Sequence, residues 1–420
     1  MSAETNINAA PVQRDAKILG LVGAGHFFSH FFGIALPPLF PLMQADMAVS
    51  YAALGALLAM ANVATMVCQV PVGVLVDRVG ARLPLVIGLS LMSGGIAAIS
   101  IAPAYGVALA LMLVVGIGNS VFHPADYAVM SAHISPQRLG RAFSLHTFAG
   151  HVGWAVSPMT LAFLTTLWNW RLALAAAGLC GILTAVWILV QGRELDTKAS
   201  GAGEPAPPAQ TPATIAGAKI APVRVLASAP IILFFLYMVF AAVGSSGLNG
   251  FAVTVLVNGR GVPLAAANFA LTALLICSAL GVLLGGLIAD RTRRHDLVIV
   301  AGFCAAAGVA ATLGLVSLPI AAMVGGLSVV GLAQGMIRPS RDMMVRNIAP
   351  PGSVGTVFGF VTAGLNVGSA VSPIFFGWLI DSGLSGGVFV VAAGAMLLAL
   401  GAALLAGGRA TARARMEAPG

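Results

Sequence analysis

The chain has 420 residues, of which 59% are hydrophobic and only 8% are charged, with a formal net charge of +8. A soluble protein of this length needs far more charge to cover its surface, so that class is excluded. The 51 glycines fit helices that pack closely in lipid. The excess of Arg and Lys fits membrane orientation better than nucleic-acid binding.

A helix needs about 20 apolar residues to cross a bilayer, and the sequence offers six such segments before a polar break and six after it. They are, in chain order, 17–43, 51–76, 83–102, 105–133, 140–165, 170–191, 229–256, 263–289, 297–317, 320–347, 355–380 and 385–407. The break is rich in Pro, Ala, Gly and charge, which is typical of a flexible linker. We therefore predict an all-α integral membrane protein with twelve transmembrane helices. Its predicted parts are an N-terminal six-helix bundle (1–191), a cytoplasmic linker (192–228), a C-terminal six-helix bundle (229–408) and a cytoplasmic tail (409–420).

An even number of spans places both termini on the same side of the membrane. If that side is the cytoplasm, only Arg171 and Arg260 fall in outer loops, and the other loop cations lie inside. The positive-inside rule therefore predicts a multi-pass protein of the inner membrane with cytoplasmic termini. No short apolar segment with a cleavage site precedes the first span, so a cleaved signal peptide is not expected.

The second half of the chain repeats the first. Gly73–Arg78 (GVLVDR) returns 213 positions later as Gly286–Arg291 (GLIADR). Val152–Pro158 (VGWAVSP) returns 215 positions later as Val367–Pro373 (VGSAVSP). Two like bundles with a site between them are the build of many transporters, so we expect the bundles to be pseudo-symmetric.

The first copy of the shorter motif resembles the loop between helices two and three of the major facilitator superfamily, and the second copy is looser. The resemblance covers essentially the whole chain and implies the major facilitator fold. It also implies a conformational latch that holds in one state and breaks in the other. The latch residues would be Gly73, Asp77, Arg78, Gly80, Arg82, Asp290 and Arg291. The alternative is that these charges only set the topology.

Within the superfamily, the chain resembles the fosmidomycin-resistance-like branch most closely. The resemblance rests on His26–Phe32 with Leu36–Leu39 in helix one, on Gly116–Pro124 in helix four and on Gly140–Ser144 entering helix five. Two motifs of the best-known drug antiporters are incomplete, because Met112 stands where helix four often carries an arginine and the glycine-dense motif of helix five matches only in part.

A polar stripe is predicted on helix four and again, 215 positions later, on helix ten. The first stripe holds Asn119, His123 and Asp126, and the second holds Gln334, Arg338 and Arg341. A helix turns by about 100° per residue, so each stripe should lie on one face. The resemblance implies that helices one, four, seven and ten line a central cavity.

Guanidinium groups in that cavity would favour a phosphate, phosphonate or carboxylate. Substrate binding is therefore predicted at Arg338, Arg341, Asn119, His123 and Gln334. Two alternatives stay open: the arginines are ordinary helix-end cations, or Asp126 and Arg338 form an ion pair that serves assembly only.

Proton coupling is predicted at Asp126, His30 and His26, with His123 as a further candidate. A carboxylate in an apolar span takes up a proton readily unless it is paired, and histidine titrates near neutral pH. For each histidine, a packing role is as plausible. His146 and His151 lie about 140° apart on helix five, so both cannot line the cavity.

These features favour a secondary transporter that exports a small anionic or amphipathic compound by proton-coupled alternating access. An importer of an organic or inorganic anion with the same site is the alternative, and a receptor or scaffold without transport is a third possibility. The sequence shows no nucleotide loop, no metal-ligand spacing and no nucleophile–base pair. We therefore expect no enzyme activity, no metal and no cofactor, with a proton gradient as the energy source. The expected partners are the small-molecule substrate, protons and the lipid bilayer, without nucleic acid, and the expected state is a monomer.

Overall fold

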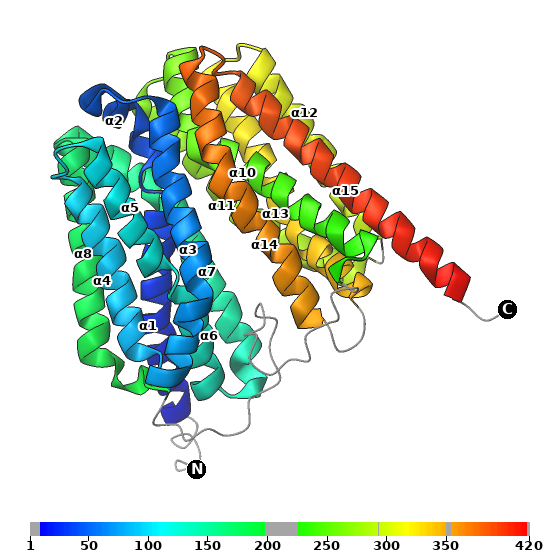
Figure 1. The fold of residues 1–420 in the computed structure, drawn as a ribbon, viewed down its shortest axis with the longest axis horizontal. Helices are drawn as coiled ribbons and strands as arrows, with labels where there is room; N and C mark the ends of the chain where they lie inside the picture. The colour runs from blue at the N-terminus through cyan, green and yellow to red at the C-terminus, as the bar shows by residue number, and fades with distance from the viewer. Residues whose placement is uncertain (1–8, 198–225, 293, 350–353, 418–420) are drawn as a thin grey trace, which may run out of the picture. The chain divides into compact units, whose positions relative to one another are not determined.

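The computed structural model describes residues 9–197, 226–292, 294–349 and 354–417. Within these ranges all regular structure is helical (Figure 1), which confirms the predicted fold class. Eleven helical segments are long and apolar enough to cross a membrane. The twelfth, α7 (Pro136–Leu167), has 32 residues and carries the polar side chains discussed below.

The helices follow the predicted segments closely. The first set is α1 (Ala9–Gly33), η1 (Pro37–Leu39), α2 (Phe40–Met47), α3 (Tyr51–Val79), α4 (Arg82–Ile99), α5 (Tyr105–Asn119), α6 (Phe122–His133), α7 (Pro136–Leu167), α8 (Trp170–Gln191) and η2 (Gly192–Leu195). The second set is α10 (Ala229–Arg260), α11 (Leu264–Arg291), α12 (His295–Leu315), α13 (Ile320–Ile348), α14 (Val354–Asp381) and α15 (Gly387–Glu417).

The structure adds detail to three of the predicted spans. The span predicted over 105–133 is confirmed as one candidate membrane span, Tyr105–His133, within which a turn at Ser120 and Val121 separates α5 from α6. The segment expected over 17–43 is likewise divided into α1, η1 and α2. The last helix continues to Glu417, beyond the predicted end at 407. Most of the predicted linker, residues 198–225, lies outside the described residues.

The chain divides into two compact units. The first unit comprises residues 1–36 and 60–208, and the second comprises residues 37–59 and 209–420. The start of α3 therefore packs with the second unit. There Asp381, at the end of α14, accepts hydrogen bonds from the backbone N–H groups of Tyr51 (2.7 Å) and Ala52 (2.8 Å). A carboxylate at a helix N-terminus satisfies free donors and complements the helix dipole.

Glycines allow helices to approach closely at repeated positions of the two units. A Cβ added at Gly116 on α5 would lie 2.3 Å from the carbonyl oxygen of Ala61 on α3. A Cβ added at Gly331 on α13 would lie 2.0 Å from the carbonyl oxygen of Leu274 on α11. No side chain fits at such distances, so these helix pairs require glycine. The same close approach through small residues is typical of helices packed in lipid.

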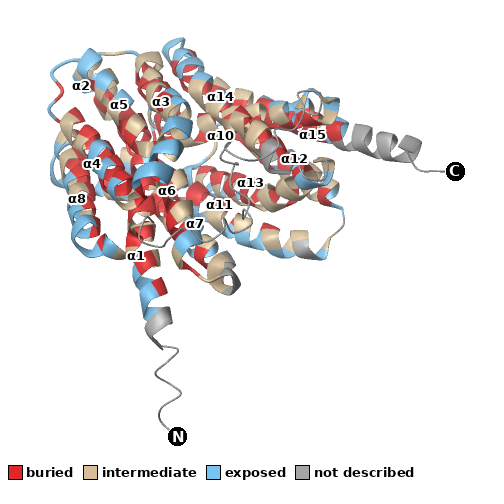
Figure 2. Ribbon diagram, turned by 60° about the horizontal axis from the view of Figure 1, so that its bottom comes forward, coloured by how far each residue is buried: buried red, intermediate tan, exposed pale blue. Residues whose placement is uncertain are grey.

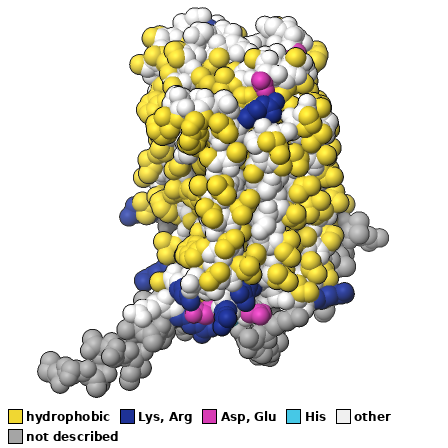
Figure 3. All heavy atoms as spheres, turned by 90° about the vertical axis from the view of Figure 1, so that its left-hand side faces the viewer, with side chains coloured by type: hydrophobic (Ala, Val, Ile, Leu, Met, Phe, Trp, Pro, Cys, Tyr) yellow, Lys and Arg dark blue, Asp and Glu magenta, His cyan; other side chains and the backbone are white. Residues whose placement is uncertain are grey.

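The outer surface of the first unit is apolar between its ends. Figure 3 shows hydrophobic side chains over most of this face, with most Lys and Arg at its lower end and a further basic group near its upper end. On α8 the exposed large hydrophobic residues include Leu179, Leu183, Val186, Trp187 and Val190. Buried and exposed residues alternate along the helices (Figure 2), so each helix turns one side to its neighbours and another outward. An exposed apolar belt of this extent fits contact with lipid rather than water.

Candidate functional site

The first unit encloses a group of polar side chains where α1, α6 and α7 meet. His26 comes from α1, Asp126 from α6 and His146 from α7. The exposed fraction is 3% for His26, 0% for Asp126 and 2% for His146. A carboxylate and two imidazoles are thus removed from solvent inside an apolar bundle. Buried polar groups of this kind are costly in a membrane and point to function.

The three side chains converge on one carboxylate oxygen. Nδ1 of His26 lies 3.3 Å from Oδ2 of Asp126, and Nε2 of His146 lies 3.4 Å from the same oxygen. The two imidazole rings are stacked, with centroids 3.7 Å apart and planes inclined by 29°. The two separations are within the range of an ion pair, but neither contact meets the geometry of a hydrogen bond. Neither oxygen of Asp126 therefore has a hydrogen-bond partner among the described residues.

The close approach of α1 and α7 places these rings. A Cβ at Gly153 would lie 2.2 Å from the carbonyl oxygen of Phe27, so glycine is required there. One turn earlier, a Cβ at Gly150 would lie 2.8 Å from Cδ2 and Nε2 of His26. One turn later, the hydroxyl of Ser157 donates a hydrogen bond of 2.9 Å to the carbonyl oxygen of Phe31. The α7 backbone thus packs against one edge of the His26 ring, while Nδ1 of that ring faces Asp126.

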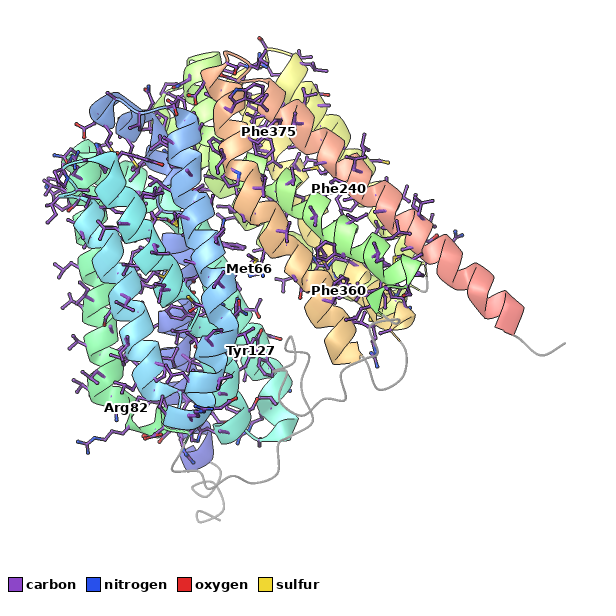
Figure 4. The ribbon with its side chains drawn as sticks, in the orientation of Figure 1. Met66, Arg82, Tyr127, Phe240, Phe360 and Phe375 are labelled. Atoms are coloured by element: carbon purple, nitrogen blue, oxygen red, sulfur yellow. The ribbon has the colours of Figure 1, made fainter. Side chains whose placement is uncertain are left out.

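Further rings surround this core. The ring centroid of His30 lies 4.4 Å from that of His26 and 4.5 Å from that of Trp154. The His123 ring lies 5.7 Å from the His26 ring, and His123 is exposed although Asp126, one turn later on α6, is fully buried. Tyr127 of α6, labelled in Figure 4, lies beside the ring of His146 at 6.0 Å. We call His26, His30, His123, Asp126 and His146 the histidine cluster.

The structure brings together all four residues considered for proton coupling, and it adds His146 to them. The helical periodicity indicated only that His146 and His151 cannot both line a central cavity, and it did not distinguish between them. The feature of the sequence that could have indicated His146 is the number of histidines in the segments that form α1, α6 and α7. Of the predicted substrate residues in this unit, Asn119 is half-buried, and its amide donates a hydrogen bond of 3.3 Å to Thr65 of α3.

The second unit carries the other predicted stripe on α13. Gln334, Arg338 and Arg341 are all half-buried. The guanidinium of Arg341 pairs with the carboxylate of Asp342, next to it on the helix, at 2.8 Å. Arg341 therefore has a carboxylate partner within its own helix, whereas no ion pair with Arg338 occurs among the described residues.

The predicted latch residues lie at helix ends. Asp77, Arg78 and Arg291 are exposed, Gly73 is half-buried, and the side chain of Asp290 lies outside the described residues. Gly80 has a φ of 85°, so the turn between α3 and α4 requires the left-handed backbone that glycine adopts freely. Arg82, labelled in Figure 4, donates a hydrogen bond to the carbonyl oxygen of Leu189 on α8.

The all-helical fold agrees with comparisons to known proteins. The family model of the Major Facilitator Superfamily matches residues 22–265 and 234–418. The chain belongs to this superfamily. It is similar to YfnC of Bacillus subtilis (strain 168), an uncharacterized MFS-type transporter, with 26% identity over 376 residues that make up 87% of each chain.

A second relative is the Fosmidomycin resistance protein of Escherichia coli (strain K12), with 26% identity over 147 residues. This match covers 35% of this chain and 36% of that protein. Among solved structures, a bacterial homolog of the human lysosomal transporter Spinster, inward-facing and unoccupied, has a TM-score of 0.75 at 15% identity. It covers 96% of this chain and 97% of that chain, which shows a shared fold. The protein is a multi-pass membrane transporter of the major facilitator superfamily.

Proposed function

We propose that the protein is a proton-coupled exporter of a small anionic or amphipathic compound that works by alternating access. The observation that carries this proposal is the burial of Asp126 beside His26 and His146. A carboxylate without a cationic partner of fixed charge can gain and lose a proton during a transport cycle. Asp126 is the coupling residue in this proposal, with His26, His30 and His123 as proton carriers near it.

The substrate anion is bound in this proposal by the arginines of α13. Arg338 supplies the free guanidinium, because Arg341 is engaged by Asp342. A guanidinium fork accommodates a phosphonate or carboxylate with two parallel hydrogen bonds. The partial match to the Fosmidomycin resistance protein supports a place in that branch and makes a phosphonate the first compound to test. Asn119, His123 and Gln334 complete the proposed substrate contacts, and the latch residues control access.

The test uses the purified protein in liposomes with fosmidomycin as the probe. Flux should rise when an opposing pH gradient is imposed and should collapse with a protonophore. In Asp126→Asn the gradient-driven flux should fall at least about tenfold, because an amide does not take up and release a proton as a carboxylate does. Exchange of substrate across the membrane without a gradient should persist. Asp46→Asn, at the end of α2, is the matched control and should transport like the wild type.

Two results would overturn the coupling proposal: flux that ignores the protonophore, or an Asp126→Asn protein that still responds to the gradient. Direction is decided by the same assay in cells. Lower intracellular probe on expression supports export, while accumulation would establish import of an anion through the same arginines. Binding of the probe without any flux would indicate a receptor instead.

A further inference from the structure

We propose that His26, Asp126 and His146 form a binding site for one divalent transition-metal ion of the Zn²⁺, Co²⁺ or Ni²⁺ class. One ligand comes from each of three helices, and the ligand atoms all lie within 4.8 Å of one another. Spacing along the sequence could not show this group, since the residues are far apart in the chain. The fold alone brings them together.

The distances between ligand atoms fit a metal-centred tetrahedron. Zinc binds histidine nitrogen and carboxylate oxygen at about 2.0–2.2 Å, so neighbouring ligand atoms of a tetrahedral site lie ~3.3 Å apart. The three ligand atoms form a triangle. Oδ2 of Asp126 lies 3.3 Å from Nδ1 of His26 and 3.4 Å from Nε2 of His146. The distance between the two imidazole nitrogens is no longer than 4.8 Å, and it shortens when the two rings turn toward an ion.

The hydrogen-bonding state of these atoms also points to an ion. Nδ1 of His26, both oxygens of Asp126 and both ring nitrogens of His146 are buried without a hydrogen-bond partner among the described residues. Buried polar atoms left unpaired are costly, and they are rare in native structures. A single cation satisfies one atom from each side chain at once, which hydrogen bonds in the observed geometry do not.

The ligand types select the class of ion. Two imidazoles with one carboxylate suit Zn²⁺, Co²⁺ and Ni²⁺, whereas Mg²⁺ and Ca²⁺ prefer an all-oxygen shell of six or more ligands. Three protein ligands leave the fourth position of a tetrahedral site open for water or a further ligand. His123 is exposed and its ring is 5.7 Å from that of His26, so an exposed imidazole lies close to the site.

The surrounding packing holds His26 in the orientation that the site needs. The ring edge with Cδ2 and Nε2 lies against the backbone of α7 at Gly150, which leaves Nδ1 as the coordinating nitrogen. The hydroxyl of Ser29 donates a hydrogen bond of 2.8 Å to the carbonyl oxygen of His26. A bound ion would tie α1, α6 and α7 together at one point. Its consequence for transport rests on the proposed function: a metal and a proton compete for the same carboxylate, so the metal should inhibit proton-driven flux.

The test is metal binding to the full-length protein, purified with its affinity tag removed and stripped with a chelator. Equilibrium dialysis against Zn²⁺ should give one tightly bound ion per chain. Co²⁺ should give the intense visible absorption of a tetrahedral site. Asp126→Asn and His146→Gln should each lower the affinity by at least about tenfold. The matched control is His133→Gln, on the same helix as Asp126 but outside the cluster, and it should bind like the wild type.

Zn²⁺ binding that survives Asp126→Asn would overturn the proposal. If either variant fails to fold, the Co²⁺ spectrum of the wild type decides, because the weak absorption of an octahedral ion would overturn it equally. Failure of this site and failure of the proposed function are distinguishable. If the stripped protein shows gradient-driven flux but binds no metal, only the proposal of a metal site is overturned. If the protein binds metal but shows no flux, only the proposal of proton-coupled transport is overturned.

Discussion

The two units use the same helix packing around different polar chemistry. Gly116 and Gly331 stand 215 positions apart, and the carbonyl groups they contact, from Ala61 and Leu274, stand 213 positions apart. The close helix contact is therefore repeated along with the sequence. Such contacts tolerate no Cβ, so both halves keep the glycine.

The polar positions on the same helices have diverged. Asp126 in the first unit is fully buried among histidines, whereas Arg341, 215 positions later, is half-buried and pairs with Asp342. The helix around them differs as well, because a turn at Ser120 interrupts the first copy while α13 runs unbroken through Pro339. The glycine contacts are thus shared by both halves, whereas the polar side chains are specific to each half. A substitution can therefore be chosen to affect the shared part or the divergent part.

The largest effect is expected at the shared glycines. Gly331→Ala places a Cβ 2.0 Å from a backbone oxygen, and Gly116→Ala places one at 2.3 Å, so the helices must move apart. Overpacking of this kind costs roughly 1–3 kcal/mol of stability. Both variants should unfold at lower temperature in detergent, which a thermal size-exclusion assay measures.

Gly325 provides the control on α13, because a Cβ there meets nothing within 4 Å. Gly325→Ala should be neutral or slightly stabilising, since alanine favours a helix by about 0.5–1 kcal/mol over glycine. Equal destabilisation by all three substitutions would contradict the role of close contact. Destabilisation by Gly331→Ala alone would mean that the two glycines matched by the sequence repeat do not contribute equally to stability.

Much of the fold could be predicted from the sequence, because apolar length and the matched motifs specify helices directly. The turn within the predicted helix 105–133 could not, since Ser120 and Val121 carry no strong helix-breaking signal. Pro124 follows that turn within the first turn of α6, where proline is tolerated. On α6, His123 is exposed and Asp126 is buried, a difference that helical periodicity alone did not predict.

The histidine cluster was only partly predictable for a different reason. His26, His30 and Asp126 were candidates because charged or titratable groups are rare in apolar spans. Their meeting point depends on which helices are neighbours and on the close approach at Gly150 and Gly153. Sequence periodicity gives the face of a helix, but it does not give the neighbour that the face meets. His146 was therefore missed, although its ring stacks on that of His26.

An effect of comparable size, on substrate affinity instead of stability, is expected at Arg338, in the divergent stripe of the second unit. Arg338→Ala removes the guanidinium that we propose for anion binding, and a charge-assisted hydrogen bond contributes about 1.5–3 kcal/mol. The KM for fosmidomycin in liposomes should rise by roughly ten- to a hundredfold, while the response to the pH gradient stays intact. Arg346→Ala, on the same helix but exposed, controls for loss of charge alone. A similar KM change in both variants would show that bulk charge, and not a site, attracts the anion.

The smallest effect tests a contact that only one half possesses. Asp381 caps the start of α3 in the second unit, whereas the position 215 residues earlier is Thr166, whose hydroxyl bonds to Phe163 within its own helix. Asp381→Ala should cost about 1 kcal/mol, the usual contribution of a capping side chain, and should lower the unfolding temperature slightly. Asp381→Asn should retain part of that stability, because an amide oxygen still accepts one hydrogen bond. Thr166→Ala should be close to neutral. If Asp381→Ala is equally neutral, the cap contributes nothing measurable to stability. The two halves would then differ only in their polar stripes among the features compared above.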